Sequence, residues 1–232
     1  MKAARKRGAG AGKGEETRER ILNAALDLFR RRGFDQTTMR EIAAEAGMSL
    51  GSAYYYFESK EALVMAFYER ASAEMHARLE AVFTHPAGFE ERLRAIISIK
   101  FAYFAPNRRF LGALVRHAAD PRDPLSPLSD KTRHIRDRDE RHFARALAES
   151  RMAVPKDLAI HLPKLLWLYQ MALILFWTYD RSAGQRRTER LLEESLGLLT
   201  TSLKLAALPF LRPLRKKVIA LVLAAEGGES NA

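Results

Sequence analysis

The sequence contains no cysteine among its 232 residues. Disulfide bonds, thiolate metal sites and cysteine nucleophiles all require that side chain, so the sequence excludes each of them. A long apolar run is also missing, because the most apolar stretch, residues 165–178, contains Gln170 and is shorter than the roughly 20 apolar residues that cross a membrane. We therefore expect this stretch to form a buried helix, and we expect no membrane partner.

No stretch of the sequence alternates apolar and polar residues with the β-branched enrichment that is typical of strands. Apolar residues recur instead at spacings of three and four, as Ile21, Ala25 and Leu28 do, which indicates amphipathic helices. The sequence therefore predicts an all-α fold of about nine to ten helices, with an N-terminal three-helix helix-turn-helix domain. A larger C-terminal helical domain is expected to bind a ligand and to dimerise.

Positive charge exceeds negative charge, with 39 Lys and Arg against 28 Asp and Glu and a formal net charge of +11. This excess favours a polyanionic partner, because neutralising phosphates with Lys and Arg releases condensed counterions and drives association. Nucleic acid is the first expectation. The alternative is that the excess only keeps the protein soluble, since five of the positive charges lie in the opening segment before Glu15.

Residues 1–14 contain only Gly, Ala, Lys and Arg after Met1, which predicts a disordered basic arm. No apolar run follows the basic N-terminus, so we expect no secretory signal and a cytoplasmic location. Residues 15–60 are predicted to form the helix-turn-helix domain, and residues 61–210 the ligand-binding and dimerisation domain. Residues 211–232 are predicted to form a basic C-terminal tail helix and a disordered end.

Two capping signals define the helix-turn-helix. Thr38 and Glu41 have the spacing of a capping box, which starts a short second helix near Met39. This helix stops at Gly47, after which Ser49 caps a third helix from Leu50 to about residue 57. Further helical patterns cover residues 59–85, 89–105, 108–119, 128–151, 156–179 and 185–207, and a short helix follows Pro213.

The third helix carries the residues with which a helix-turn-helix domain reads DNA. It lies in the major groove with its N-terminal residues nearest the base edges, while the second helix crosses the backbone. Tyr54 and Tyr55 are expected to face phosphates or thymine methyl groups, with Phe57 packed inward, and Lys60 is expected to bind a phosphate. The alternative is that the tyrosine run packs in the core or in a dimer. The predicted DNA-binding residues are Thr37, Thr38, Arg40, Ser49, Gly51, Ser52, Tyr54, Tyr55 and Lys60.

Three runs, residues 34–43, 46–57 and 59–63, together resemble the signature of the tetracycline-repressor (TetR) family, and the resemblance covers roughly residues 17–65. It implies an Ω-shaped all-α homodimer, usually a repressor, with a variable ligand pocket in the C-terminal domain. Leu50 departs from the polar or basic residue of many members, so we expect base reading to depend on apolar contacts, on DNA shape or on the arm. The resemblance implies DNA contacts at Thr38, Ser49, Ser52, Tyr54, Tyr55 and Lys60.

The segment from Gly47 to Gly51 also matches the Gly-x-Ser-x-Gly nucleophile elbow of hydrolases. That elbow requires a strand before the serine, whereas the sequence predicts a helix there. With no strand-rich scaffold to hold a catalytic triad, we expect the protein not to be an enzyme.

The C-terminal region supplies aromatic and isolated polar residues but no recognisable chemistry. Its six histidines show no pair at metal-binding helical spacing, so no metal and no cofactor are expected. The candidate ligand-binding residues are Phe101, Phe104, His117, Phe143, Trp167 and Met171. Wide apolar faces on the last two long helices predict a four-helix dimer interface that includes Leu175, Leu192, Leu196, Leu199 and Leu203.

Together these observations predict a sequence-specific DNA-binding transcription regulator, a repressor that a small, mainly apolar ligand releases from a palindromic operator. Its expected partners are double-stranded DNA with an inverted-repeat operator, a second copy of the chain and an unidentified small molecule. The alternative is a ligand-independent, low-specificity architectural DNA-binding protein. The basic arm and the lack of Arg, Asn and Gln on the third helix favour that alternative.

Overall fold

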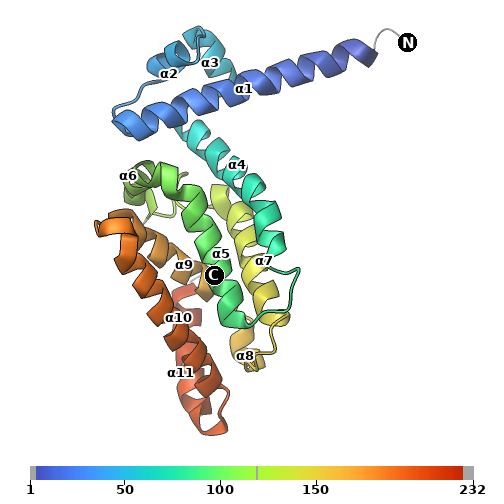
Figure 1. Ribbon diagram of the computed structural model, residues 1–232, viewed down its shortest axis with the longest axis vertical. Coiled ribbons are helices and arrows are strands. Elements are labelled where there is room, and N and C mark those ends of the chain that lie inside the picture. Colours follow the sequence, from blue (N-terminus) through green and yellow to red (C-terminus); the bar gives the residue numbers. More distant parts are fainter. Residues whose placement is uncertain (1–3, 119, 227–232) are drawn as a thin grey trace, which may run out of the picture. The chain divides into compact units, whose positions relative to one another are not determined.

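The structure is a computed structural model that describes residues 4–118 and 120–226. These residues form eleven α-helices joined by turns and short 3₁₀ segments, without a strand, which confirms the all-α fold (Figure 1). The chain divides into two compact units. The first comprises Met1–Glu74 and Phe104–Ile135, and the second comprises Met75–Tyr103 and Arg136–Ala232.

The first unit contains α1 (Ala4–Arg32), α2 (Met39–Glu45), α3 (Leu50–Tyr56), the first part of α4 (Lys60–Ala81) and α6 (Arg108–Ala118). Its core is built around aromatic rings: Phe29 stacks on Phe110 with ring centroids 5.0 Å apart, and Phe67 packs against Phe110 at 5.7 Å. Leu63 and Val64 are fully buried, so the start of α4 belongs to this unit. The compact units divide near Glu74, with residues 104–135 in the first, whereas the predicted domain boundary lies at residue 60.

α1 begins at Ala4, whereas the sequence predicted disorder through residue 14. No proline interrupts residues 4–14, and α1 runs through them without a break. The four glycines among them each cost about 1 kcal/mol relative to alanine, so these are the least stable turns of α1. Residues 1–3 of the predicted arm, and 227–232 of the predicted disordered end, lie outside the described residues.

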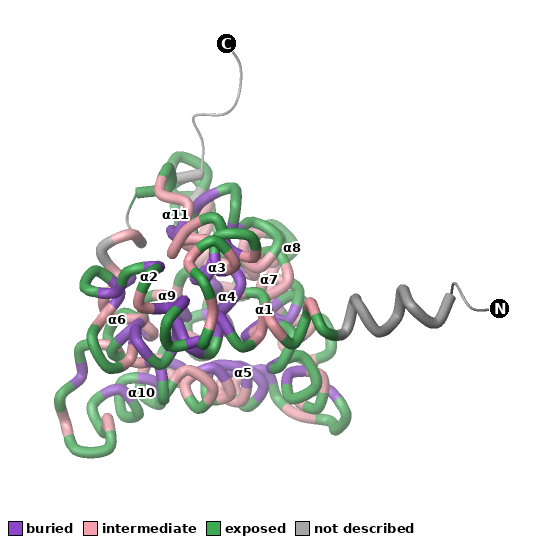
Figure 2. The backbone as a smooth tube through the Cα atoms, turned by 90° about the horizontal axis from the view of Figure 1, so that it is seen from above, coloured by how far each residue is buried: buried purple, intermediate pink, exposed green. Residues whose placement is uncertain are grey.

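The second unit contains most of α5 (Phe89–Phe104) and α7 (Arg133–Ala148), together with four further helices. Leu93, Ile97 and Phe143 are fully buried in its core, and buried positions alternate with exposed ones along the helices (Figure 2). None of the described residues forms a helix long and apolar enough to cross a membrane. The four further helices are α8 (Lys156–Ala159), α9 (Leu162–Tyr179), α10 (Arg186–Ala206) and α11 (Arg212–Glu226).

The predicted single helix over residues 156–179 is divided into α8 and α9. Pro163 lies in the first turn of α9. Proline has no backbone N–H, and its ring clashes with the carbonyl group four residues earlier, which here belongs to Ala159. The proline is well placed at a helix start and cannot occupy a helix interior without kinking it.

Asp180 joins the end of α9 to the start of α10. It is 5% exposed, and its carboxylate accepts hydrogen bonds from the backbone N–H groups of Ser182 and Thr188, both at 2.9 Å, and from the Thr188 hydroxyl at 2.8 Å. Burial opposes ionisation of the carboxyl group, but the hydrogen bonds from Ser182 and Thr188 outweigh it and hold the pKa of Asp180 well below its usual range.

We predict that Asp180→Asn lowers the thermal unfolding midpoint at pH 7 by at least about 2 °C. The difference should shrink as the pH falls below about 4, because a group with a depressed folded-state pKa stabilises the protein above its unfolded pKa and loses that effect on protonation. Circular dichroism melts at pH 7 and pH 3 measure this. Asp137→Asn, at an exposed position of α7, is the control. A difference that is the same at both pH values would contradict the assignment.

Candidate nucleic-acid interface

The start of α2 is fixed by the capping box that the sequence predicted. The Glu41 backbone N–H donates to Thr38 Oγ1 at 3.3 Å, and the Thr38 backbone N–H donates to Glu41 Oε2 at 2.9 Å. Hydrogen bonds from the Thr38 backbone and hydroxyl lower the pKa of Glu41, as does Arg32, whose guanidinium lies 2.7 Å from Glu41 Oε1. Thr38 and Arg40 are both exposed at this end of α2.

The turn between α2 and α3 depends on Gly47, whose φ of +66° lies in the left-handed region that favours glycine. The Gly47 N–H donates to the Ala44 carbonyl at 3.0 Å, and the Met48 N–H donates to the Ala43 carbonyl at 2.9 Å. These bonds satisfy carbonyl groups that the end of α2 leaves without helical partners. The result is a tight helix-turn-helix. A helix, α2, precedes Ser49, whereas a hydrolase elbow would require a strand there.

α3 presents one buried face and one exposed face. Ala53 and Phe57 are 0% and 3% exposed, whereas Tyr54 and Tyr55 are 48% and 84% exposed. The Ser49 hydroxyl caps the helix by accepting from the Ser52 N–H at 3.1 Å.

Ser49 and Gly51 are exposed at the N-terminal end of α3, and Ser52 is half-buried. Tyr56 is half-buried and packs edge-on against Tyr55, with ring centroids 5.2 Å apart. The alternative prediction was that the whole tyrosine run packs in the core. Tyr54 and Tyr55 do not pack in the core of this chain, because both are exposed.

Thr37 was predicted to contact DNA, and the structure corrects this prediction. Its side chain is 0% exposed, and its hydroxyl donates to the Gly33 carbonyl at 2.8 Å. Gly33 has a φ of +89° at the end of α1, and the Thr37 hydroxyl satisfies a carbonyl group in this turn. Thr37 stabilises the α1–α2 connection. The adjacent Thr38 is the exposed member of the pair.

Lys60 is placed differently from the free phosphate ligand that the sequence predicted. Its Nζ donates to the Phe34 carbonyl at 2.9 Å and lies 4.6 Å from the centre of the Phe34 ring. A longer contact of 3.5 Å reaches the Asp35 carbonyl. An ammonium group has three N–H donors. Two of them are directed at carbonyl groups of the α1–α2 connection, which leaves one N–H for another acceptor.

The predicted ligand-binding residues fall in different units. Phe104 and His117 belong to the first unit, where Phe104 packs against Phe67 and His117 Nδ1 lies 2.5 Å from Asp123. Phe101, Phe143, Trp167 and Met171 belong to the second unit. Phe143 and Trp167 are buried, and Phe101 is half-buried and stacks on Trp177 at 5.3 Å.

A buried polar cluster of the second unit, which the sequence did not predict, consists of Lys100, Asp139 and Gln170. Lys100 Nζ donates to Asp139 Oδ2 at 2.5 Å, and Gln170 Nε2 contacts the same oxygen at 3.5 Å. Gln170 is 0% exposed, and its Oε1 has no hydrogen-bond partner among the described residues. The three residues come from α5, α7 and α9, so no local sequence pattern connects them.

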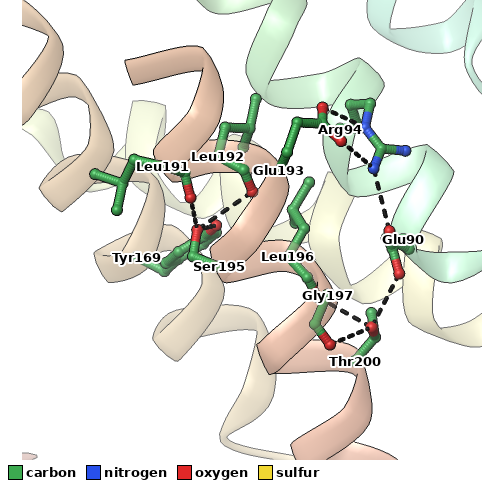
Figure 3. A network of polar contacts seen from close by, with 10 residues as sticks. All are labelled: Glu90, Arg94, Tyr169, Leu191, Leu192, Glu193, Ser195, Leu196, Gly197 and Thr200. Atoms are coloured by element: carbon green, nitrogen blue, oxygen red, sulfur yellow. Dashed lines mark hydrogen bonds and ion pairs between the residues drawn. The ribbon is translucent and has the colours of Figure 1, made fainter. Parts of the chain in front are cut away.

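A second polar network joins α5, α9 and α10 (Figure 3). Arg94 binds both carboxylate oxygens of Glu193, at 2.8 and 2.7 Å, and these bonds raise the pKa of Arg94. Tyr169 and Ser195 share a hydrogen bond of 2.5 Å between α9 and α10. The second unit is thus held by directional contacts as well as by its apolar core.

The predicted dimer residues on α10 require a correction. Leu192, Leu196 and Leu203 are at most 5% exposed because they form the face of α10 that packs into the chain's own core. A second row of apolar residues lies exposed on α9 and α10. It consists of Leu168, Leu175, Phe176, Tyr179, Leu191, Leu198 and Leu205. Of the predicted interface residues, Leu175 belongs to this exposed row.

Two family models match the chain, one in its N-terminal part and one in its C-terminal part. A family model described as "Bacterial regulatory proteins, tetR family" matches residues 21–67. A second model, "Tetracyclin repressor-like, C-terminal domain", matches residues 92–218, which is more than half of the chain. The first match contains α2 and α3, and the second contains α6 to α10 in full.

Curated relatives align over part of their length. The chain is 36% identical over 87 residues to the HTH-type transcriptional regulator SrpR of Pseudomonas putida, an alignment of 38% of this chain and 39% of SrpR. It is 28% identical over 85 residues to the fatty acid metabolism regulator protein of Bacillus subtilis, covering 37% of this chain and 44% of that protein. The chain thus spans less than half of the length of these two relatives.

Solved structures share the fold at low sequence identity. FadR from Bacillus subtilis, in complex with stearoyl-CoA, has a TM-score of 0.58 and 18% identity over 75% of this chain and 95% of that chain. A TetR transcriptional regulator from Nitrosomonas europaea has a TM-score of 0.57 and 20% identity over 78% and 96%. With its helix-turn-helix and its C-terminal domain both matched, the chain belongs to the TetR family of bacterial regulatory proteins.

Proposed function

We propose that the protein is a DNA-binding transcription regulator that inserts α3 into the major groove as a homodimer. The observation that carries this proposal is the two-faced character of α3, in which Ala53 and Phe57 are buried and Tyr54 and Tyr55 reach solvent. A helix anchored on one side by a core and exposing its N-terminal residues on the other fits the docking geometry of helix-turn-helix domains.

The residues proposed to contact DNA divide by chemistry. Thr38 and Arg40 at the start of α2 are placed for phosphates, and Ser49, Gly51 and Ser52 for the groove floor. α3 carries no Arg, Asn or Gln, so bidentate base readout from it is not available. Tyr54 and Tyr55 therefore supply thymine-methyl and phosphate contacts, and sequence-dependent DNA shape contributes to the choice of site.

We predict that Tyr54→Ala and Tyr55→Ala each weaken binding to a selected operator about tenfold, equivalent to roughly 1.4 kcal/mol. The operator is first obtained by selecting bound sequences from random DNA, and affinity is then measured by fluorescence anisotropy. Phe210→Ala removes an aromatic side chain that is 73% exposed in the second unit, and it serves as the control. Unchanged affinity in both tyrosine variants would overturn the placement of α3.

The salt dependence of binding distinguishes the proposal from a low-specificity architectural role. A specific dimer should enrich an inverted repeat and bind it at least about a thousandfold better than a scrambled duplex. Equal affinities and equally steep slopes of log affinity against log salt on both duplexes would favour the architectural protein.

Dimerisation is proposed to use the exposed apolar row of α9 and α10. Leu191, Leu198 and Leu205 are spaced by seven residues, so they lie along one side of α10, and they are 38%, 69% and 48% exposed. Pairing of α9 and α10 with the same helices of a second copy would bury this row in a two-fold four-helix interface. A two-fold protein matches an operator with two-fold symmetry.

Leu198→Glu is expected to convert the dimer to a monomer, because two glutamates would face a desolvated interface. Light scattering coupled to size-exclusion chromatography measures the mass, which is 26.3 kDa for one chain. Leu221→Glu on α11 is the matched control, since Leu221 is 71% exposed against 69% for Leu198. A Leu198→Glu protein that remains dimeric and folded would place the interface elsewhere.

Release from the operator by a small, mainly apolar ligand is the proposed signal, and repression is the proposed effect. The buried cluster of Lys100, Asp139 and Gln170 offers the few placed polar groups that ligand sites combine with apolar walls. Gln170 supports this most directly, because Oε1 is a buried acceptor without a partner among the described residues. A ligand hydroxyl or amide that donates to this oxygen would remove the cost of leaving it unpaired.

We predict that Gln170→Met, which preserves side-chain volume and removes the acceptor, weakens an effector's release of the operator about fivefold or more. The test titrates the operator complex first with stearoyl-CoA and then with a panel of apolar alcohols and amides. Ile174→Leu, on another half-buried position of α9, is the control. An operator complex that no compound dissociates would remove the sensor part of the proposal and leave DNA binding intact.

A further inference from the structure

Three potential metal ligands meet in the second unit, close to the end of α4. His76 and Glu80 are four residues apart on α4, so their side chains lie on the same face of the helix. His142 comes from α7 and packs against them. One ligand atom from each residue lies within 4.8 Å of the other two. The three side chains offer two imidazole nitrogens and a carboxylate oxygen to a common point.

The distance between Glu80 and His142 is close to that between two ligands of one ion. Glu80 Oε1 lies 3.8 Å from His142 Nε2, which is too long for a hydrogen bond. Two ligands that each lie about 2.0–2.1 Å from a tetrahedral Zn²⁺ are about 3.3 Å apart. A shift of roughly half an ångström, within the range of side-chain rotation, brings the pair to that separation.

Glu80 is oriented by a neighbouring cation. Its Oε2 accepts a hydrogen bond of 2.7 Å from Arg145 Nη1, which leaves Oε1 directed at His142. The positive charge of Arg145 is balanced by Glu149, whose Oε1 lies 2.5 Å from Arg145 Nε. Hydrogen-bonded partners of this kind hold first-shell ligands of metal sites in place.

His142 is the buried member of the group. It is 7% exposed, and its Nδ1 has no hydrogen-bond partner among the described residues. Burial lowers the pKa of His142, with Lys100 and His76 acting in the same direction and Asp139 and Glu80 opposing them. The hydrogen bond from Arg145 lowers the pKa of Glu80.

We propose that His76, Glu80 and His142 bind one divalent transition-metal ion, with Zn²⁺ as the best fit. Two imidazoles and one carboxylate match the ligand types that zinc accepts, and three protein ligands leave a fourth position for water or another small ligand. The sequence predicted no metal because no two histidines have a metal-binding spacing on one helix. The His-x₃-Glu spacing on α4 gains its third ligand only through the packing of α7.

The test is isothermal titration calorimetry of the full-length, tag-free protein with Zn²⁺. The wild-type chain should bind one ion per chain. His76→Ala and Glu80→Gln should each weaken this binding at least about tenfold. Both substitutions lie outside the buried core, since His76 is exposed and Glu80 half-buried, and circular dichroism checks that the variants fold. His85→Ala replaces another exposed histidine, just beyond α4, and should leave the affinity unchanged.

Tetrahedral Co²⁺ absorption provides a second readout, because its visible bands report the coordination of a bound ion. Loss of these bands in His76→Ala but not in His85→Ala would support the assignment. Absence of binding by the wild-type chain at 100-fold molar excess would overturn it, and so would equal affinities of wild-type, His76→Ala and Glu80→Gln. Both readouts are independent of DNA, so the result does not depend on the proposed function.

Discussion

Burial of Ala53 and Phe57 in the core of the first unit determines which side of α3 reaches solvent. Successive residues of a helix project about 100° apart, so fixing these two residues also fixes the directions of Tyr54 and Tyr55. The core of this unit also contains the packed rings of Phe29, Phe67 and Phe110. The DNA contact proposed for α3 would thus depend on an apolar contact that does not itself touch DNA.

Two polar side chains of this unit that the sequence predicted to bind DNA have structural roles instead. Thr37 and Lys60 both have side chains suited to phosphates, yet Thr37 donates to the carbonyl of Gly33 and Lys60 to that of Phe34. These carbonyls belong to the connection between α1 and α2, where the chain reverses and helical hydrogen bonds end. Such groups cost free energy if left unpaired, which explains why neighbouring hydrogen-bond donors are recruited to them.

Local physics made much of the fold predictable. The caps at Thr38 and Ser49 and the glycine at position 47 act within a few residues, and the bounds of α2 and α3 follow from them. The division of α8 from α9 was also encoded locally, in Pro163, although the apolar periodicity continues through it. Apolar periodicity indicates which side of a helix is buried, whereas a proline interrupts the backbone hydrogen bonds of the helix.

What could not be predicted depends on contacts between distant segments. The buried cluster of Lys100, Asp139 and Gln170 joins three helices, and the group of His76, Glu80 and His142 joins two, so neither has a contiguous sequence signature. The sequence also did not show which face of α10 packs into the core, because leucines occur on both of its apolar faces. Only packing shows that Leu196 points inward while Leu198 is exposed.

The two faces of α10 differ in what a substitution changes. Substitutions on the inner face, at positions such as Leu192 and Leu196, change the chain's own free energy of unfolding. Substitutions on the outer face leave that core intact and change only which surface another chain must match. If the exposed row forms the proposed dimer interface, it can diverge and prevent mixed dimers with regulators of the same architecture, while the core of the single chain stays intact.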